Sequence, residues 1–199
     1  MFWKLYIYFF SVKINKQPQT VKIKRIVVGK LATNCYLFIS GQESAIIDPG
    51  DEADKILKQV EKTKTKVKYI INTHSHFDHI LASDELREKT GAAVLIHEEE
   101  KKLVNFKVDK FLKEKDKIKI GSAVLKVVHT PGHTPGGICL LSKEVIFTGD
   151  TIFKNGYGRT DLAGGSFEKL KDSLKKLAGL LKPGITVYPG HGESFKINK

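Results

Sequence analysis

The chain has 199 residues, of which 41% are hydrophobic and 28% are charged, with 17 glycines. These proportions are typical of a globular domain and argue against a fibrous repeat or a fully disordered chain. The formal net charge of +12 comes from lysines spread along the sequence, which is typical of a solvated surface. It can also attract anionic ligands, and the lack of arginine clusters disfavours nucleic acid.

The first ten residues, MFWKLYIYFF, differ from the rest by their aromatic content. They are too few to cross a bilayer, and no signal-cleavage site follows them. We interpret residues 1–20 as an N-terminal extension and residues 21–199 as the domain, with no membrane span. Three roles are open for the extension: an added strand, an interface element, or translation from a start codon upstream of the true one.

From Val21 onward the sequence shows a run of strand patterns, followed by a mixture of helix and strand patterns. A helix is expected after Asp51, which can cap it, a second at about 79–89, and a third at 167–181, where leucines recur at helical spacing before Pro183-Gly184. Because several strands come first, the order favours layered sheets with helices outside. The expected strands are 22–28, 34–40, 44–48, 67–72, 92–97, 124–128, 137–141, 145–148 and 186–188.

The two cysteines, Cys35 and Cys139, are far apart in the sequence and form no CxxC pair. This pattern argues against a disulfide scaffold and a cysteine-built zinc finger. We expect a cytoplasmic protein in which both thiols are buried in strands.

The segment Thr73-His74-Ser75-His76-Phe77-Asp78-His79 follows the strand that ends at Asn72. In extended chain, residues 74, 76 and 78 point to one side, and His79 then begins a helix. Imidazole nitrogen and carboxylate oxygen are the ligands of borderline divalent metals, so the spacing predicts a metal site.

Three further potential ligands each follow an expected strand and are flanked by glycine or proline. His133 lies in a turn-rich loop, Asp150 follows Thr148-Gly149, and His191 follows Pro189-Gly190. Glycine and proline allow the sharp turns that direct such side chains into a common site. The sequence therefore predicts that these residues join the 74–79 cluster.

With the HxHxDH motif followed by His133, Asp150 and His191 in order, the chain resembles the metallo-β-lactamase superfamily over about residues 21–195. The resemblance implies an α+β fold, a four-layer αββα sandwich with the metal site at one edge of the two sheets. It also implies two divalent metal ions, with zinc first and iron or manganese as alternatives. By position, His74, His76 and His133 would bind one ion, Asp78, His79 and His191 the other, and Asp150 would bridge them. We expect His97 and His129 to be structural or to support a ligand, and Asp48 to contact a ligand histidine.

Further sequence features indicate which branch of the superfamily the chain resembles. The segments Gly149–Phe153 and Gly158–Asp161 look like those of glyoxalase II-like hydrolases and the related persulfide dioxygenases. The bridging Asp150 disfavours a true β-lactamase, and His76 disfavours flavodiiron proteins. The sequence ends soon after His191, so we expect the small, single-domain branch without a glutathione-gripping helical domain.

The function implied is metal-dependent hydrolysis of thioesters of the hydroxyacylglutathione type by a metal-bridging hydroxide, with Asp78 and Asp150 as catalytic residues. A mononuclear iron persulfide dioxygenase is the alternative, and a nucleic-acid-binding or processing protein of the same fold is a third. An anionic small-molecule substrate is expected, with Arg159 either orienting its carboxylate or pairing with Asp161. Tyr157 is a weaker candidate for substrate contact, and the oligomeric state is open.

Overall fold

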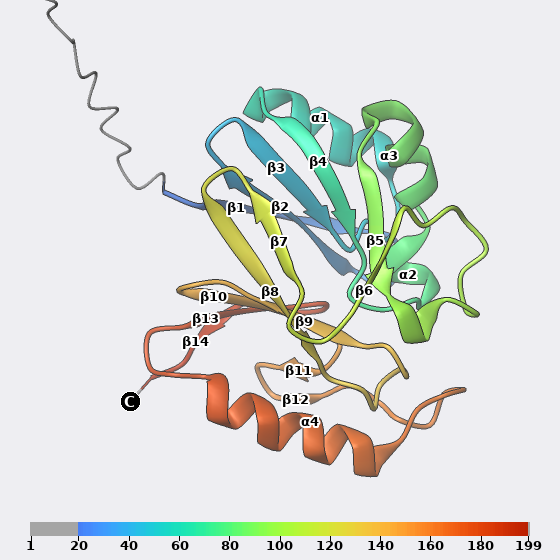
Figure 1. The fold of residues 1–199 in the computed structure, drawn as a ribbon, viewed down its shortest axis with the longest axis vertical. Helices are drawn as coiled ribbons and strands as arrows, with labels where there is room; N and C mark the ends of the chain where they lie inside the picture. Colours follow the sequence, from blue (N-terminus) through green and yellow to red (C-terminus); the bar gives the residue numbers. More distant parts are fainter. Residues whose placement is uncertain (1–19, 199) are drawn as a thin grey trace, which may run out of the picture.

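The computed structural model describes residues 20–198, so the roles considered for the N-terminal extension lie outside the described residues. Two six-stranded sheets face one another, and helices cover their outer faces (Figure 1). In the first sheet the order is β1-β2-β3-β4-β5-β6; β1 to β3 are antiparallel, and β3 to β6 are parallel. Its strands are β1 (Lys22–Val28), β2 (Thr33–Ser40), β3 (Glu43–Ile47), β4 (Lys66–Ile71), β5 (Ala93–His97) and β6 (Lys110–Leu112).

The second sheet has the order β14-β13-β10-β9-β8-β7, in which only the β10–β13 pair is parallel. A two-stranded hairpin, β11 (Ile152–Phe153) and β12 (Gly156–Tyr157), follows β10. The strands of the second sheet are β7 (Lys117–Ile120), β8 (Ala123–His129), β9 (Ile138–Leu141), β10 (Val145–Gly149), β13 (Thr186–Pro189) and β14 (Phe195–Lys196).

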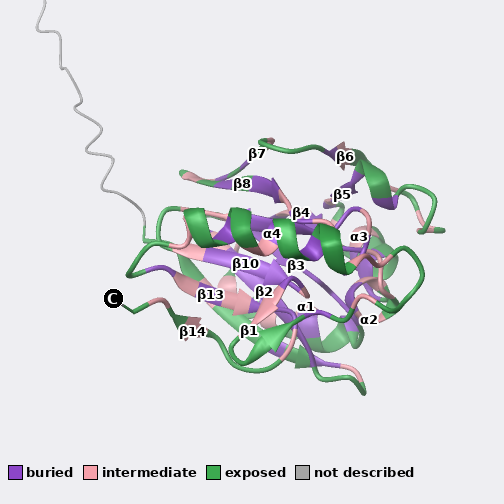
Figure 2. Cartoon of the chain, turned by 90° about the horizontal axis from the view of Figure 1, so that it is seen from below, coloured by how far each residue is buried: buried purple, intermediate pink, exposed green. Residues whose placement is uncertain are grey.

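Three apolar layers hold the four-layer sandwich together. Helices α1 (Ala53–Thr63) and α3 (Ser83–Thr90) pack on the outer face of the first sheet, and α4 (Phe167–Leu180) packs on the second. Figure 2 shows α4 with exposed residues outward and the buried strands behind it. Cys35 lies in the layer under α1 and Cys139 in the layer under α4, both fully buried, as expected. The predicted αββα architecture is confirmed.

The middle layer, between the sheets, contains an aromatic cluster centred on Phe147. Its ring centroid lies 5.2 Å from that of Tyr36, 6.0 Å from Phe38 and 5.3 Å from Tyr188. Since Tyr36 and Phe38 belong to β2 and Tyr188 belongs to β13, the cluster joins the two sheets. Buried aromatic side chains contribute large apolar areas and favour such tilted contacts.

The expected helix at 79–89 is two helices, α2 (Phe77–Ile80) and α3. The amide of Ala82 donates to the carbonyl of Pro49 at 3.0 Å instead of continuing the α2 ladder, so the helix breaks there. The cap expected at Asp51 is also wrong: Glu52 precedes α1 in a left-handed conformation, and Asp51 Oδ1 accepts the Glu52 amide. Strands β6, β7 and β14 and the β11–β12 hairpin were not expected.

We predict that Phe147→Ala lowers the free energy of unfolding by about 3–5 kcal/mol, because it opens a cavity between the sheets. Urea denaturation followed by circular dichroism measures the change. Val124→Ala is the control, since this valine is 40% exposed on β8 and its truncation should cost under about 0.5 kcal/mol. A loss below about 1 kcal/mol for Phe147→Ala would show that the aromatic cluster does not hold the sheets together.

Candidate metal centre

The predicted site residues come together at one edge of the sandwich, where four strands end. The HxHxDH segment follows β4 and runs into α2, His133 follows β8, Asp150 follows β10, and His191 follows β13. Their potential ligand atoms form overlapping groups in which all atoms lie within 4.8 Å of one another. The groups are His74, His76 and His133; His74, His79 and Asp150; and Asp78, His79 and His191.

Asp150 lies between the two outer groups. Its Oδ2 is 3.5 Å from His133 Nε2 and 3.5 Å from His191 Nε2, and its Oδ1 is 3.4 Å from His79 Nε2. On the far side of His191, Asp78 Oδ2 is 3.2 Å from His191 Nε2. One carboxylate therefore faces both halves of the cluster, which is the arrangement expected for a bridging ligand.

The second nitrogen of three histidines is held by an acceptor elsewhere in the chain. His133 Nδ1 donates to the Arg159 carbonyl at 2.7 Å, and His191 Nδ1 to the Leu31 carbonyl at 3.1 Å. His79 Nδ1 lies 3.1 Å from Asp48 Oδ2. The two hydrogen bonds fix the tautomers of His133 and His191 that leave Nε2 directed into the cluster, and the Asp48 carboxylate lies beside the ring of His79.

Asp48 connects β3 to the cluster, as expected from the sequence. Besides its contact with His79, its carboxylate accepts the Thr73 amide at 2.7 Å and the Thr73 hydroxyl at 2.8 Å. Asp48 is buried and adopts a left-handed backbone conformation, φ 52°. It therefore fixes both the start of the HxHxDH segment and the ring of His79.

Two glycines allow the backbone to approach the cluster closely. A Cβ on Gly190 would overlap Asp150 Oδ1 and lie 2.7 Å from His79 Cε1. A Cβ on Gly158 would overlap the Asp150 carbonyl and lie 3.0 Å from His133 Nδ1. Any larger residue at these positions would displace ligand side chains, because a real Cβ does not approach other atoms so closely.

Burial and charge favour a metal here. Burial, with the neighbouring His79 and His133, keeps the pKa of His74 well below its usual value, so this ring is neutral. Burial also disfavours charge on His79, but the carboxylates of Asp150 and Asp48 outweigh it and raise the pKa of His79 to about 9.

Several ligand atoms lack partners. His74 Nε2, His133 Nε2 and Asp150 Oδ1 are buried without a hydrogen-bond partner among residues 20–198. Buried polar atoms are normally satisfied, because leaving them unpaired costs about 1–3 kcal/mol each. Neutral imidazole with anionic carboxylate is also the donor set of zinc and similar ions. The residues present therefore fit divalent metals.

The remaining candidates lie around the cluster. The exposed Arg159 guanidinium pairs with Asp161, with Arg159 Nε donating to Oδ1 at 2.7 Å, so the ion pair considered from the sequence is present. Tyr157 is exposed, with its ring 6.1 Å from Phe167. His97 and His129 stack with centroids 4.0 Å apart, and His129 Nε2 donates to the Pro135 carbonyl, so both act outside the cluster.

Sequence reasoning missed two supports of the second half of the cluster. The Thr33 hydroxyl donates to Asp78 Oδ2 at 2.8 Å, and Leu31 supplies the carbonyl that holds His191. Leu31 lies in the turn between β1 and β2, and Thr33 is the first residue of β2. A hydroxyl at Thr33 carries no recognisable motif, and a backbone carbonyl carries no residue-type signal at all.

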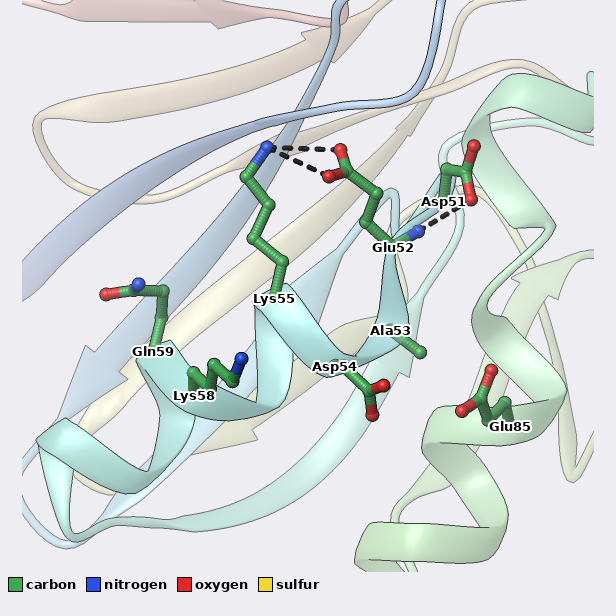
Figure 3. Close-up of a pocket in the computed structure, with 8 residues that line it drawn as sticks. All are labelled: Asp51, Glu52, Ala53, Asp54, Lys55, Lys58, Gln59 and Glu85. Atoms are coloured by element: carbon green, nitrogen blue, oxygen red, sulfur yellow. Dashed lines mark hydrogen bonds and ion pairs between the residues drawn. The ribbon is translucent and has the colours of Figure 1, made fainter.

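A separate surface hollow lies at the start of α1 (Figure 3). Its carboxylates are largely paired with lysines: Glu52 lies 3.1 Å from Lys55, and Asp54 lies 3.0 Å from Lys89. These exposed ion pairs are typical of a solvated surface. The hollow therefore adds nothing to the cluster.

The layered fold and the histidine–aspartate cluster at its edge define a metal-dependent class of protein. A sequence model described as the metallo-beta-lactamase superfamily matches residues 28–191, and the chain belongs to this superfamily. The hydroxyacylglutathione hydrolase GloC of Haemophilus influenzae is 32% identical over 200 residues, covering 90% of this chain and 94% of that protein.

Two solved structures match most of the chain. The BLEG-1 B3 metallo-beta-lactamase has a TM-score of 0.83 at 30% identity, covering 88% of this chain and 94% of that one. TTHA1623 in a di-iron-bound form has a TM-score of 0.79 at 31% identity, covering 87% and 94%. These comparisons confirm the predicted relationship to the metallo-beta-lactamase superfamily, and the relatives of this chain include hydrolases such as GloC.

Within residues 20–198, no helix combines the length and apolar character needed to cross a membrane.

The His97–His129 stack generates a pH prediction. Burial and the neighbouring His129 lower the pKa of His97 from 6.5 to about 4. The unfolded chain therefore binds more protons than the folded chain between those pH values, and stability is lost as pH falls through this window. We expect His97→Asn, which keeps an acceptor for the Glu99 amide, to lose less stability from pH 7 to pH 4 than the unmodified protein.

The difference between the two proteins should reach at most about 3 kcal/mol. Urea denaturation at a series of pH values measures it, and the carboxylates common to both proteins cancel in the comparison. Parallel stability curves for the two proteins would contradict the assignment of His97.

Proposed function

We propose that this chain is a binuclear metal-dependent hydrolase of thioesters, of the hydroxyacylglutathione type. The observation that carries the proposal is the position of Asp150, whose carboxylate faces both His133 and the His79–His191 pair. His74, His76 and His133 would hold one ion, and Asp78, His79 and His191 the other. The similarity to GloC supports this reaction class.

Bound divalent ions would supply hydroxide at neutral pH and polarise a carbonyl oxygen. The chain's contribution is to hold the ligands: Asp48, Leu31 and Arg159 orient three imidazoles, and Thr33 orients Asp78. The leaving thiolate has a pKa of about 8.5 and departs without a strong general acid. With two carboxylates against two divalent ions, the centre would stay positive, which suits an anionic substrate.

Zinc is the proposed metal, with iron and manganese as alternatives, because histidine and carboxylate ligands suit all three. Elemental analysis of protein purified without added metal reports both identity and number per chain. Two ions per chain support the binuclear proposal. One iron per chain, with oxygen uptake on a glutathione persulfide, would replace the hydrolase by the persulfide dioxygenase.

We predict that Asp150→Asn lowers kcat/KM for S-lactoylglutathione or a simpler thioester by at least about 100-fold and reduces metal content, while the circular dichroism spectrum is unchanged. Asp172→Asn is the matched control, since this exposed carboxylate on α4 pairs with Lys175 and belongs to neither half of the cluster. Thioesters and a chromogenic cephalosporin are assayed in parallel with the fully metal-loaded protein. Turnover of the cephalosporin alone, or of no thioester, would reject the proposal.

A further inference from the structure

A hollow of about 220 Å³ opens beside the second half of the cluster. Asp78, a proposed ligand, lines it, together with Lys30, Leu31, Phe77 and Leu81. It thus reaches the cluster from the turn between β1 and β2 on one side and from α2 on the other. Because Asp78 belongs both to the lining of the hollow and to the cluster, the hollow adjoins the second half of the cluster.

Three of the residues that line this hollow have exposed apolar side chains, and the charged residues Lys30, Asp51 and Asp78 line it as well. Leu31 is 53% exposed, Phe77 61% and Leu81 60%. Phe77 and Leu81 lie one helical turn apart, with the Leu81 amide donating to the Phe77 carbonyl at 3.1 Å. Isolated exposed apolar residues are common, but several gathered in one hollow at a functional site indicate a binding surface.

A second hollow, which His191 itself lines, is more polar than the first. Lys154, Asn155 and Glu193 line it with Phe153, and Lys154 Nζ lies 2.7 Å from Glu193 Oε2. In a thioester, the acyl group and the thiol group leave the reacting carbonyl in opposite directions. The two hollows therefore match an apolar group on one arm and a polar group on the other.

We propose that the Leu31–Phe77–Leu81 hollow binds the acyl group of the substrate and selects thioesters with an apolar acyl chain on a polar thiol. This inference rests on the proposed thioester hydrolysis and specifies its substrate class. The polar thiol arm lies toward Lys154 and Asn155. Lys30 and Asp51 also line this hollow, so its charged side chains are of both signs.

The test is a series of thioesters of one polar thiol, from acetyl to octanoyl, assayed with the metal-loaded protein. Each methylene buried contributes about 0.8 kcal/mol, so kcat/KM should rise about three- to fourfold per methylene until the hollow is filled. Leu31→Ser and Leu81→Ser should flatten this rise. Leu103→Ser, at a leucine 52% exposed outside the hollow, should preserve it.

The outcomes separate the inference from the function. Hydrolysis that does not depend on acyl chain length, or a rise that the two serine variants leave intact, overturns the acyl site but keeps the thioester hydrolase. A rise with thiol chain length instead of acyl chain length also overturns it. If no thioester is hydrolysed, the proposed function itself is rejected.

An independent observation concerns Glu100, in the 3-10 helix Glu98–Glu100 after β5. This glutamate is fully buried. Its Oε2 accepts the amide of Ser75 at 3.2 Å and the Ser75 hydroxyl, and its Oε1 accepts the amide of Gly136 at 2.6 Å. A Cβ on Gly136 would lie 2.6 Å from Glu100 Cγ, so only glycine permits this approach.

The donors lie in the two loops that carry one half of the cluster. Ser75 separates His74 from His76, and Gly136 follows His133 by three residues. The other half is supported by different groups, namely Asp48, Thr33 and Leu31. The buried carboxylate of Glu100 thus joins the loop that carries His74 and His76 to the loop that carries His133. It forms no hydrogen bond with the other ligand loops described above.

The structure assigns Glu100 as a positioning residue that sets the metal affinity of the His74–His76–His133 group separately from that of the Asp78–His79–His191 group. Glu100→Gln keeps the volume but replaces one acceptor by a donor, which then faces the Ser75 or the Gly136 donors. Outer partners of metal ligands typically change affinity about 10–100-fold. We expect Glu100→Gln to weaken binding of the ion at the His74–His76–His133 group by about 10–100-fold. Binding of the ion at the Asp78–His79–His191 group should weaken by less than about twofold.

Competition with a chromogenic chelator measures the two affinities, and the absorption spectrum of the cobalt-substituted protein reports the ligand geometry. Glu99→Gln, at the exposed neighbour in the same 3-10 helix, should change neither. Ser75→Ala, which removes only the hydroxyl donor, should shift the same ion by a smaller factor. Equal weakening of both ions together with a lower melting temperature of the metal-free protein would make Glu100 merely structural, and unchanged affinities would overturn the assignment.

Discussion

The structure depends on gathering imidazoles and carboxylates within a few ångströms at an edge of the sandwich where His74, His79 and His133 are buried. Such groups are costly to bury unless each polar atom has a partner. The protein satisfies outer atoms of His133, His191 and Asp78 through the Arg159 and Leu31 carbonyls and the Thr33 hydroxyl. It leaves His79 Nδ1, His74 Nε2 and Asp150 Oδ1 without a hydrogen bond among residues 20–198. The surrounding scaffold must hold these groups in place, because the contacts of His79 and His191 with the carboxylates leave His74 Nε2 and His133 Nε2 without a hydrogen bond among the described residues.

Hydrogen bonds and aromatic contacts between the two sheets hold the ligand residues in place. The Tyr36 hydroxyl and the Asn34 side-chain amide, both on β2, donate to the Pro189 carbonyl at 2.7 and 3.0 Å, and the Asn34 backbone amide donates to Gly190. These bonds join the first sheet to the end of β13, immediately before His191. The aromatic contacts of Phe147 and Tyr36 lie directly beneath them. Apolar packing between the sheets therefore also fixes the distance between the two halves of the cluster.

The sequence predicted those features of the site that depend on which type of residue stands at a position. The HxHxDH segment, His133, Asp150 and His191 are recognisable because few other roles require those side chains after strands, and the alternation in Lys22–Val28 marked β1 with its observed bounds. The break between α2 and α3 was not predictable, because it depends on a hydrogen bond to Pro49, 33 residues before Ala82. Strand β7, with its alternating KIKI sequence, was missed because its lysines were interpreted only as surface charge.

Glu100 and Leu31 illustrate a second limit of sequence reasoning. Glu100 stands in a run of three glutamates, and nothing in the sequence distinguishes the buried one from its exposed neighbours. Leu31 acts twice, with its carbonyl on His191 and its side chain at the apolar hollow. The same short turn thus links ligand orientation to the surface that a substrate would contact. A shift of the turn backbone would move the support of His191 and the wall of the hollow together, whereas a side-chain substitution at Leu31 keeps the carbonyl that holds His191.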